Sequence, residues 1–563
     1  MMFSNITIFI LFYVLIISSV LGYGILITSF SKKLKISNDF GYIGLIGFFF
    51  LIFYSYLSSF FIKHDLLHNS LIIFFGAISF FLFTFKKLKF FKKEYLNLVI
   101  IFSVLFLGVL IFKNHDDFPY YHFPYSYHLT QNELTIGIGH LNLGFRTPSS
   151  VFYLSSLFYL PLIKFYLFNM PAILILGFSN LILIEKIFKN ISKINYRFII
   201  YFSILVFIFI NVFFYRIAEH GTDRSAQILI FILIIEVLSF INFKEKKNII
   251  ISKIYILIGL IVSLKAFYIL YVLFLLIVLY QIIKDKNLLF AFNKLLKNIY
   301  FIPLIILVSF VFLTYFFNTG CIIYPLSFTC FENIIWAIDK KEVVELNNWY
   351  EQWSKAGAGP NFRVENPEEY IKYFNWVENW VDKYFFNKVS DYLLGLAILI
   401  IICFLNFYSL KKVKHFNNFE IKSVLLLLFV LFIEWFYNHP SLRYGGYSII
   451  SSIIFIYFSL RFSKYYVNKK KIKKKFKILI AISLLIFLTR NIDRIFNEVS
   501  FYSYKPLSEV FYNMNQSHYF RIENSIKELK REYNQCKINI ELCNQNSKIK
   551  VTRQFKKYIF YTD

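Results

Sequence analysis

Apolar runs long enough to cross a bilayer dominate this sequence and leave few folds open to it. Only 17% of its 563 residues are charged, against about one quarter in soluble proteins. These features exclude a soluble enzyme, a disordered chain and a secreted disulfide scaffold. We expect an all-α polytopic membrane protein, because a helix satisfies its own backbone hydrogen bonds in lipid. About fourteen runs approach the roughly 20 residues that a spanning helix needs: 6–29, 41–62, 69–85, 96–112, 171–187, 198–215, 225–242, 249–264, 267–283, 299–317, 391–409, 423–437, 447–462 and 477–490.

The positive charge is arranged as a topology signal. The net charge of +28 would suggest nucleic acid if it formed a patch on a soluble domain. Here most Lys and Arg cluster in short loops, so we expect no nucleic-acid partner and read the loops by the positive-inside rule. The loops are 32–35, 86–93, 186–197, 244–247, 284–297, 411–414 and 464–477.

All these loops share one side only if the run 151–167 does not cross completely. This run carries Pro161 and Lys164, and we favour a surface or re-entrant helix over a full span. The opposite, outer side then receives 113–150, 219–224, 318–390, 438–446 and the tail after about 490. Nine of the ten histidines fall on this outer side, two of them, His64 and His68, in the short connection between the second and third runs. The first apolar run is too long for a cleavable signal peptide and predicts an ordinary first helix.

We therefore divide the chain into a transmembrane domain, 1–490, and an extracytoplasmic cap, 491–563. Short alternating runs in the tail, such as 537–542, favour a small α+β fold. Two cysteine pairs lie in outer segments, where disulfides persist: Cys321 with Cys330, and Cys536 with Cys543. Four unrelated thiols are the alternative. Cys403 lies inside an apolar run.

The loop after the fourth run carries the clearest chemistry, in the stretch 114–124 (NHDDFPYYHFP). Asp116 and Asp117 are adjacent, and like charges disfavour each other's ionisation. Such a pair can supply a general base or hold a divalent cation such as Mg or Mn. The alternative is helix capping or a solvated surface. No spacing here matches a zinc motif.

This loop resembles the first external loop of the GT-C glycosyltransferases, which use a lipid-linked sugar donor. The resemblance rests on residues 116–124, on Gly137 to Gly139 and on the aromatic stretch 149–154, with later echoes at 319–326 and 439–444. It covers about 96 to 460, and its motifs are short. The chain differs from the common pattern in having three extra spans before the acidic loop and a cysteine pair in the middle loop.

The resemblance implies transfer of a sugar from a polyprenyl phosphate to a glycan, lipid or protein acceptor, with inversion. It implies that Asp116 or Asp117 is the base, the other orienting it or binding a metal. Arginine suits the leaving phosphate, which makes Arg443 the first and Arg224 the second candidate. The alternative for both is an anchor or a salt bridge. The remaining candidate substrate-binding residues are His115, Tyr121, His122 and Tyr444.

Other polar residues have two interpretations each. Glu219 and Asp223 form a second acidic site or cap a helix. Glu236, Lys265 and Glu434 lie within apolar runs. Lys265 and Glu434 can snorkel or line a cavity, and we expect snorkelling by default rather than a proton relay. The large outer loop 318–390 is rich in Trp and Tyr, which suit either sugar stacking or an interfacial belt.

Sidedness and resemblance together predict a multi-pass protein of the bacterial inner membrane with a periplasmic active face. A flippase or transporter of lipid-linked glycans is the first alternative, but we find no internal repeat of the kind transporters carry. An O-antigen-type polymerase or ligase is the second, and it leaves the early Asp pair without a role.

Overall fold

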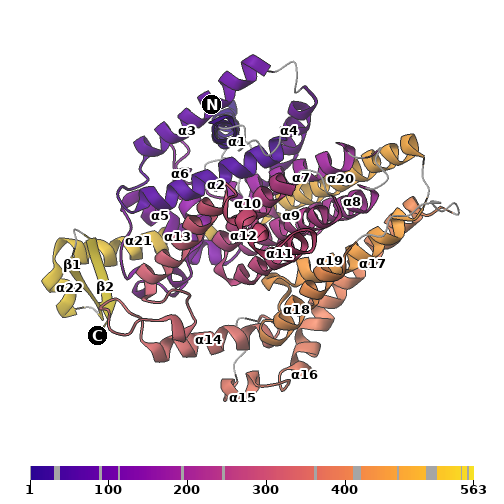
Figure 1. Ribbon diagram of the computed structural model, residues 1–563. Coiled ribbons are helices and arrows are strands. Elements are labelled where there is room, and N and C mark those ends of the chain that lie inside the picture. The colour runs from indigo at the N-terminus through magenta and orange to yellow at the C-terminus, as the bar shows by residue number, and fades with distance from the viewer. Residues whose placement is uncertain are drawn as a thin grey trace.

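The computed structural model is built almost entirely of helices, with one small C-terminal sheet (Figure 1). It describes residues 2–30, 39–87, 92–111, 114–189, 191, 196–243, 247–359, 364–409, 420–465, 468–502, 517–546, 548–554 and 557–562. The predicted basic loops 32–35 and 411–414 lie outside these residues, as do parts of 86–93, 186–197, 244–247 and 464–477.

The first half of the chain forms helices α1 to α13. Their bounds are α1 Met2–Phe30, α2 Phe40–Ser59, α3 Leu66–Lys87, α4 Lys92–Leu105, α5 Phe123–Gln131, α6 Ser150–Leu157, α7 Met170–Lys189, α8 Arg197–Val212, α9 Asp223–Asn242, α10 Lys247–Leu264, α11 Phe274–Asp285, α12 Leu288–Leu296 and α13 Phe301–Thr319.

The second half forms the outer-loop helices, the last long helices and the C-terminal cap. Their bounds are α14 Lys340–Lys355, α15 Pro367–Ile371, α16 Val377–Trp380, α17 Ser390–Phe407, α18 Lys422–Asn438, α19 Gly446–Ser463, α20 Lys469–Tyr502, α21 Ser517–Ile538, α22 Ile540–Asn546, β1 Ile549–Gln554 and β2 Lys557–Thr562.

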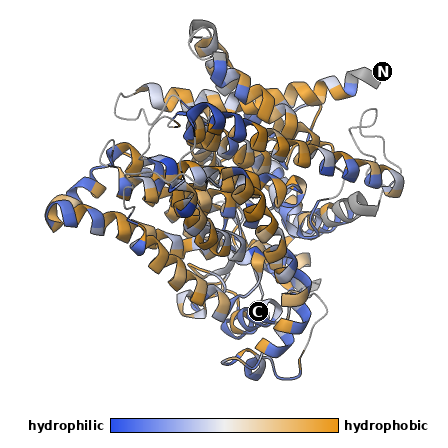
Figure 2. Cartoon of the chain, turned by 90° about the vertical axis from the view of Figure 1, so that its right-hand side faces the viewer, coloured by the Kyte–Doolittle hydropathy of each residue, from blue (hydrophilic) through white to orange (hydrophobic). Residues whose placement is uncertain are grey.

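Ten helical segments among the described residues are long and apolar enough to cross a membrane. They coincide with ten of the fourteen predicted runs. The runs at 96–112, 198–215, 423–437 and 477–490 also form helices, α4, α8, α18 and α20, but the count of fourteen spans stays a prediction. Figure 2 shows the apolar helices gathered in the body of the molecule, with hydrophilic segments toward its edges.

Helix α9 is the most deeply buried of the candidate spans, with 94% of its apolar window inside the protein. It packs against α7, α8, α10, α11, α18 and α19. An all-round apolar sequence explains this position, since a helix without a polar face is buried on every side. Its first residue, Asp223, is therefore held near the centre of one end of the bundle.

The run 151–167 does not form a spanning helix. Helix α6 ends at Leu157 after eight residues, about 12 Å at 1.5 Å per residue, and turns follow it. The outer loop differs from expectation at its end: helical structure runs without a break from Val377 to Phe407, so the last part of 318–390 continues into the next span.

In the tail, helix α20 continues to Tyr502, beyond the predicted boundary at 490. The two strands of the cap are antiparallel, and Val551 pairs with Phe560. Helices and strands together form the cap, which agrees with the predicted α+β fold, but the alternating run 537–542 contributes no strand: it forms the end of α21 and the start of α22.

Candidate functional site

Four charged side chains from distant parts of the chain meet in one ion-pair network. Arg443 Nη2 lies 3.2 Å from Asp117 Oδ2, and Arg443 Nε lies 3.1 Å from Asp223 Oδ2. Lys265 Nζ lies 2.5 Å from Asp223 Oδ1. Asp223 thus bridges two cations, and Arg443 bridges two carboxylates.

The ends of three long helices bring the network together. Asp223 begins α9, Lys265 directly follows α10, and Arg443 lies in a short 3-10 turn, Leu442–Tyr444, just before α19. Asp117 is the residue before a π-helical turn, Phe118–His122. The first external loop therefore contributes an acid to a site whose other charges stand at helix termini.

The network is layered from the interior to the surface. The Asp223 side chain is only 8% exposed, whereas Arg443 and Asp117 are 41% and 37% exposed. Burial would lower the pKa of Arg443, but Asp223, Tyr444 and Asp117 outweigh it and raise that pKa above its usual value. The guanidinium is a permanent positive charge at the open edge of the site.

Aromatic rings line the cations. The Arg443 guanidinium lies 5.5 Å from the Trp353 ring and 5.6 Å from the Tyr444 ring, and Lys265 Nζ lies 4.5 Å from the Tyr444 ring. These are cation–π distances. Trp353 belongs to α14, so the large outer loop reaches the acidic first loop at this point.

The two adjacent aspartates have different surroundings. Asp117 is half-buried and paired with Arg443. Asp116 is exposed and makes no hydrogen bond or ion pair with any residue that the structure describes. The two carboxylates cannot be distinguished from the sequence, but in the fold they have different exposure and different partners.

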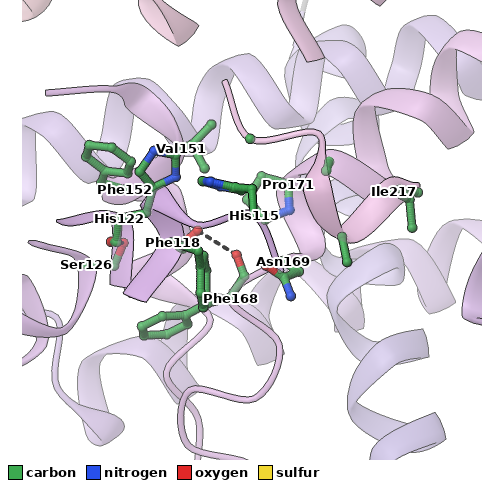
Figure 3. Close-up of a pocket in the computed structure, with 14 residues that line it drawn as sticks. His115, Phe118, His122, Ser126, Val151, Phe152, Phe168, Asn169, Pro171 and Ile217 are labelled. Atoms are coloured by element: carbon green, nitrogen blue, oxygen red, sulfur yellow. Dashed lines mark hydrogen bonds between the residues drawn. The ribbon is translucent and has the colours of Figure 1, made fainter. Parts of the chain in front are cut away.

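His115 and His122 lie beside the network with their ring centroids 4.4 Å apart (Figure 3). Burial lowers the pKa of His115 to about 4 and that of His122 well below its usual value. Both are neutral near pH 7. Tyr121 packs on His122 at 4.5 Å, and burial raises the pKa of its hydroxyl well above the ordinary value.

The two histidines line a small pocket with Ser126, Asn169 and other residues. The cavity volume is about 20 Å³, which is room for about one water molecule. Gly221 closes it, with φ at +52° and a Cβ position only 3.2 Å from His115 Nε2, so a larger residue is strained here. The pocket is far too small for a sugar.

Other predicted site residues lie outside the network. Arg224 is half-buried beside His220 and forms no ion pair with a described residue. Glu219 is no second acidic site: it pairs with Arg494 at 2.9 Å and Arg216 at 3.5 Å. Asp223, in contrast, belongs to the ion-pair network.

The sequence interpretation missed Lys265, for which snorkelling was expected. Glu236 also has partners: Lys186 lies 2.8 Å and Lys253 lies 3.7 Å from its Oε1 atom. A charge inside an apolar run was the available signal in both cases, since such charges are costly and need partners. For Lys265 the partner is Asp223, 42 residues earlier.

The cysteine pairs are joined in the structure, Cys321 to Cys330 and Cys536 to Cys543, and Cys403 is free and buried. Among the described residues there is no group of three or more His, Cys, Asp or Glu side chains that could hold a metal ion. At Asp116 and Asp117 a cation would find two carboxylates, one of them already bonded to Arg443.

A family comparison bears on these residues. Residues 6–450 match the model of a family described as a domain of unknown function, DUF8201. The chain belongs to the DUF8201 family. The DUF8201 range includes all four network residues and the first external loop, and it ends before α20 and the cap. No curated protein and no solved structure matches the chain.

Proposed function

We propose that this protein is an integral membrane glycosyltransferase of the GT-C type. It moves a sugar from a polyprenyl-phosphate donor to an envelope glycan, lipid or protein acceptor, on the periplasmic side of the bacterial inner membrane. The observation that supports this most is the network of Asp117, Arg443, Asp223 and Lys265. It sets carboxylates beside two fixed cations at the ends of spanning helices.

The proposed reaction needs a group that accepts a proton. An acceptor hydroxyl attacks the anomeric carbon, its proton passes to a carboxylate, and the bond between that carbon and the phosphate oxygen breaks with inversion. Asp116 has the freer carboxylate, because an oxygen of Asp117 already accepts a bond from Arg443. We therefore assign Asp116 as the base and Asp117 as the residue that orients Arg443.

The leaving phosphate needs positive charge, because negative charge grows on its oxygen in the transition state. Arg443 is exposed enough to reach a ligand and can form two parallel bonds to a phosphate. Lys265 is a second cation, less exposed than Arg443 and held by Asp223. Mg or Mn at Asp116 and Asp117 is the alternative source of this charge.

The other predicted substrate-binding residues differ in how close they lie to the network. Tyr444 and Trp353 stack against the cations and can shape the place where donor and acceptor meet. His115, Tyr121 and His122 belong to the acidic loop and pack on one another beside the network, so we give them a supporting role. Arg224 lies outside the network and is a weaker candidate for phosphate contact.

The test is a mass profile of envelope glycans, lipids and proteins from cells lacking the protein. These cells are complemented with wild type, Asp116→Asn, Asp117→Asn or Arg443→Met at equal membrane levels. We expect wild type alone to restore a missing sugar mass. Glu332→Gln is the matched control, because it changes an exposed outer-loop carboxylate paired with Lys340, and it should behave as wild type.

Full restoration by Asp116→Asn and Asp117→Asn would remove the base from the proposal. An unchanged profile in the deletion strain would rule out transfer and favour a flippase or transporter. Restoration by Asp116→Asn but not by Asp117→Asn would reverse the roles that we assign to the two aspartates.

A further inference from the structure

The last part of the C-terminal cap, residues 517–562, is joined to the first external loop through backbone hydrogen bonds. Ile136 N donates to Tyr558 O at 3.2 Å, and Phe560 N donates to Ile136 O at 3.0 Å. Ile136 thus adds a one-residue bridge beside Ile559 of β2. Residues more than 400 positions apart share one small sheet.

The next residue shows how closely the loop approaches the cap. Gly137 has φ at +72°, and a Cβ atom here would stand 1.9 Å from Phe560 O. Only glycine fits this conformation and this distance without displacing β2. Gly137 N also donates to Phe317 O of α13 at 2.7 Å, so the loop is held between a spanning helix and the cap.

Apolar packing extends the contact to the residue after Asp117. Ile526 of α21 is buried in a cluster with Phe118, Phe123, Phe165 and Phe168. Phe118 begins the π-helical turn that Asp117 precedes. The cap helix therefore packs against the backbone segment that sets the direction of both aspartates.

Polar contacts complete the joint at its edges. Lys557 Nζ lies 2.6 Å from Glu133 Oε2 and donates to Phe60 O at 2.7 Å. The Tyr533 ring of α21 lies 4.9 Å from the ring of His128. Both loop residues in these contacts, His128 and Glu133, precede Ile136, so the joint extends along the loop rather than resting on a single point.

We infer that the C-terminal cap is a brace that fixes the first external loop, with Ile526 as a positioning residue for Asp116 and Asp117. The brace lies beyond residue 450, where the family match ends. Its effect on the loop follows from geometry alone, and its effect on sugar transfer rests on the proposed function. Ile526 acts through Phe118 and touches no reacting atom.

The test follows the loop directly in the full chain. A nitroxide at Tyr120→Cys, a side chain that is 51% exposed and three residues after Asp117, reports loop mobility in a Cys403→Ser background. Ile526→Ser should increase the mobile spectral fraction by about tenfold, since it removes a buried anchor from a small cluster. Ile538→Ser is the matched control, because Ile538 lies on the same helix and is 85% exposed.

Two further variants separate bracing from misfolding. Ile526→Val should restore the immobile spectrum. The Cys536–Cys543 disulfide is buried, so resistance to reductant equal to that of wild type, measured without denaturant, shows that the cap remains folded. Equal spectra for Ile526→Ser and wild type, or equal mobilisation by Ile538→Ser, would overturn the brace. Sugar transfer is then measured in the same variants. Mobilisation with undiminished transfer would overturn the positioning role, while absence of transfer in wild type would contradict only the proposed function.

Discussion

At the scale of single residues, Asp223 is the member of the four-residue network on which the stability of the fold depends most. Its side chain is 8% exposed and neutralises both Lys265 and Arg443. Removing one partner of a buried ion pair leaves an uncompensated charge, which costs about 3–5 kcal/mol. Asp117 offers Arg443 a second partner, but Lys265 has Asp223 alone among the ion pairs that the structure describes.

We predict that Asp223→Asn lowers the free energy of unfolding by about 3 kcal/mol or more. Thermal unfolding of the purified protein in one detergent measures the change. Asp116→Asn is the comparison, since Asp116 is exposed and should unfold like wild type. Equal midpoints for Asp223→Asn and Asp116→Asn would mean that the buried pair contributes nothing to stability.

The buried histidines His115, His128 and His140 make stability depend on pH. Burial lowers the pKa of His115 and His140 to about 4 and that of His128 to about 3, from about 6.5 in an unfolded chain. Below pH 6.5 the unfolded chain therefore binds more protons than the folded one. Stability is fully present above about 6.5 and is lost as the pH falls toward 4.

We expect the unfolding midpoint to be flat from pH 7 to 8 and to fall steadily between pH 6.5 and 4. His115→Gln should reduce the slope in this window, because one of the depressed groups is removed. A midpoint that rises on acidification would contradict neutral, buried histidines in the folded state.

At the scale of elements, the external segments depend on two disulfides. Cys321 and Cys330 close the loop between α13 and α14, and Cys536 and Cys543 join α21 to α22. A disulfide stabilises chiefly by limiting the unfolded chain, typically by about 2–4 kcal/mol. Trp353 reaches Arg443 from α14, so the first bridge lies in the same outer loop as a site residue.

Thiol labelling of the denatured protein tests both bridges. Without reductant we expect one reactive cysteine, Cys403, and none in Cys403→Ser. After reduction the count should rise to five in wild type and four in Cys403→Ser. Labelling of five cysteines before reduction would show that the four outer thiols are unpaired.

The sequence was most informative where its pattern was local. Apolar runs located the helices, and the requirement that all basic loops share one side argued against a full span at 151–167, where α6 has only eight residues. The alternating run 537–542 was misleading, because a period of two in six residues is too short to outweigh its helical packing beside β1. Short segments take their structure from neighbours that a local pattern does not contain.

The site was only half visible in the sequence for the same reason. Asp116, Asp117 and Arg443 could be selected by type and surroundings, but no local signal pairs Asp117 with a residue 326 positions later. From the sequence, Lys265 was interpreted as a snorkelling lysine, and Asp223 as a helix cap or part of a second acidic site. Their roles depend on where helix ends meet, which is a property of the assembled bundle.

At the scale of the whole molecule, the charge distribution predicts how the protein lies in the membrane. The acidic first loop and the basic start of α20 should face opposite compartments. A cysteine at position 116 should react with an impermeant reagent from the periplasm, and one at Lys470 should react only after the inner membrane is opened. Labelling of both from the same side would overturn the topology.

The ion pair between Asp117 and Arg443 has a consequence for biogenesis. A ribosome delivers the acidic loop early, yet Arg443 follows only after most helices have been synthesised, and Ile526 and β2 come last. Since chains begin to fold during synthesis, the loop must wait in an unfinished bundle without its cation or its brace. A prematurely terminated chain would be inactive. The site would become complete only late in assembly, when Arg443 and the cap have been synthesised and packed.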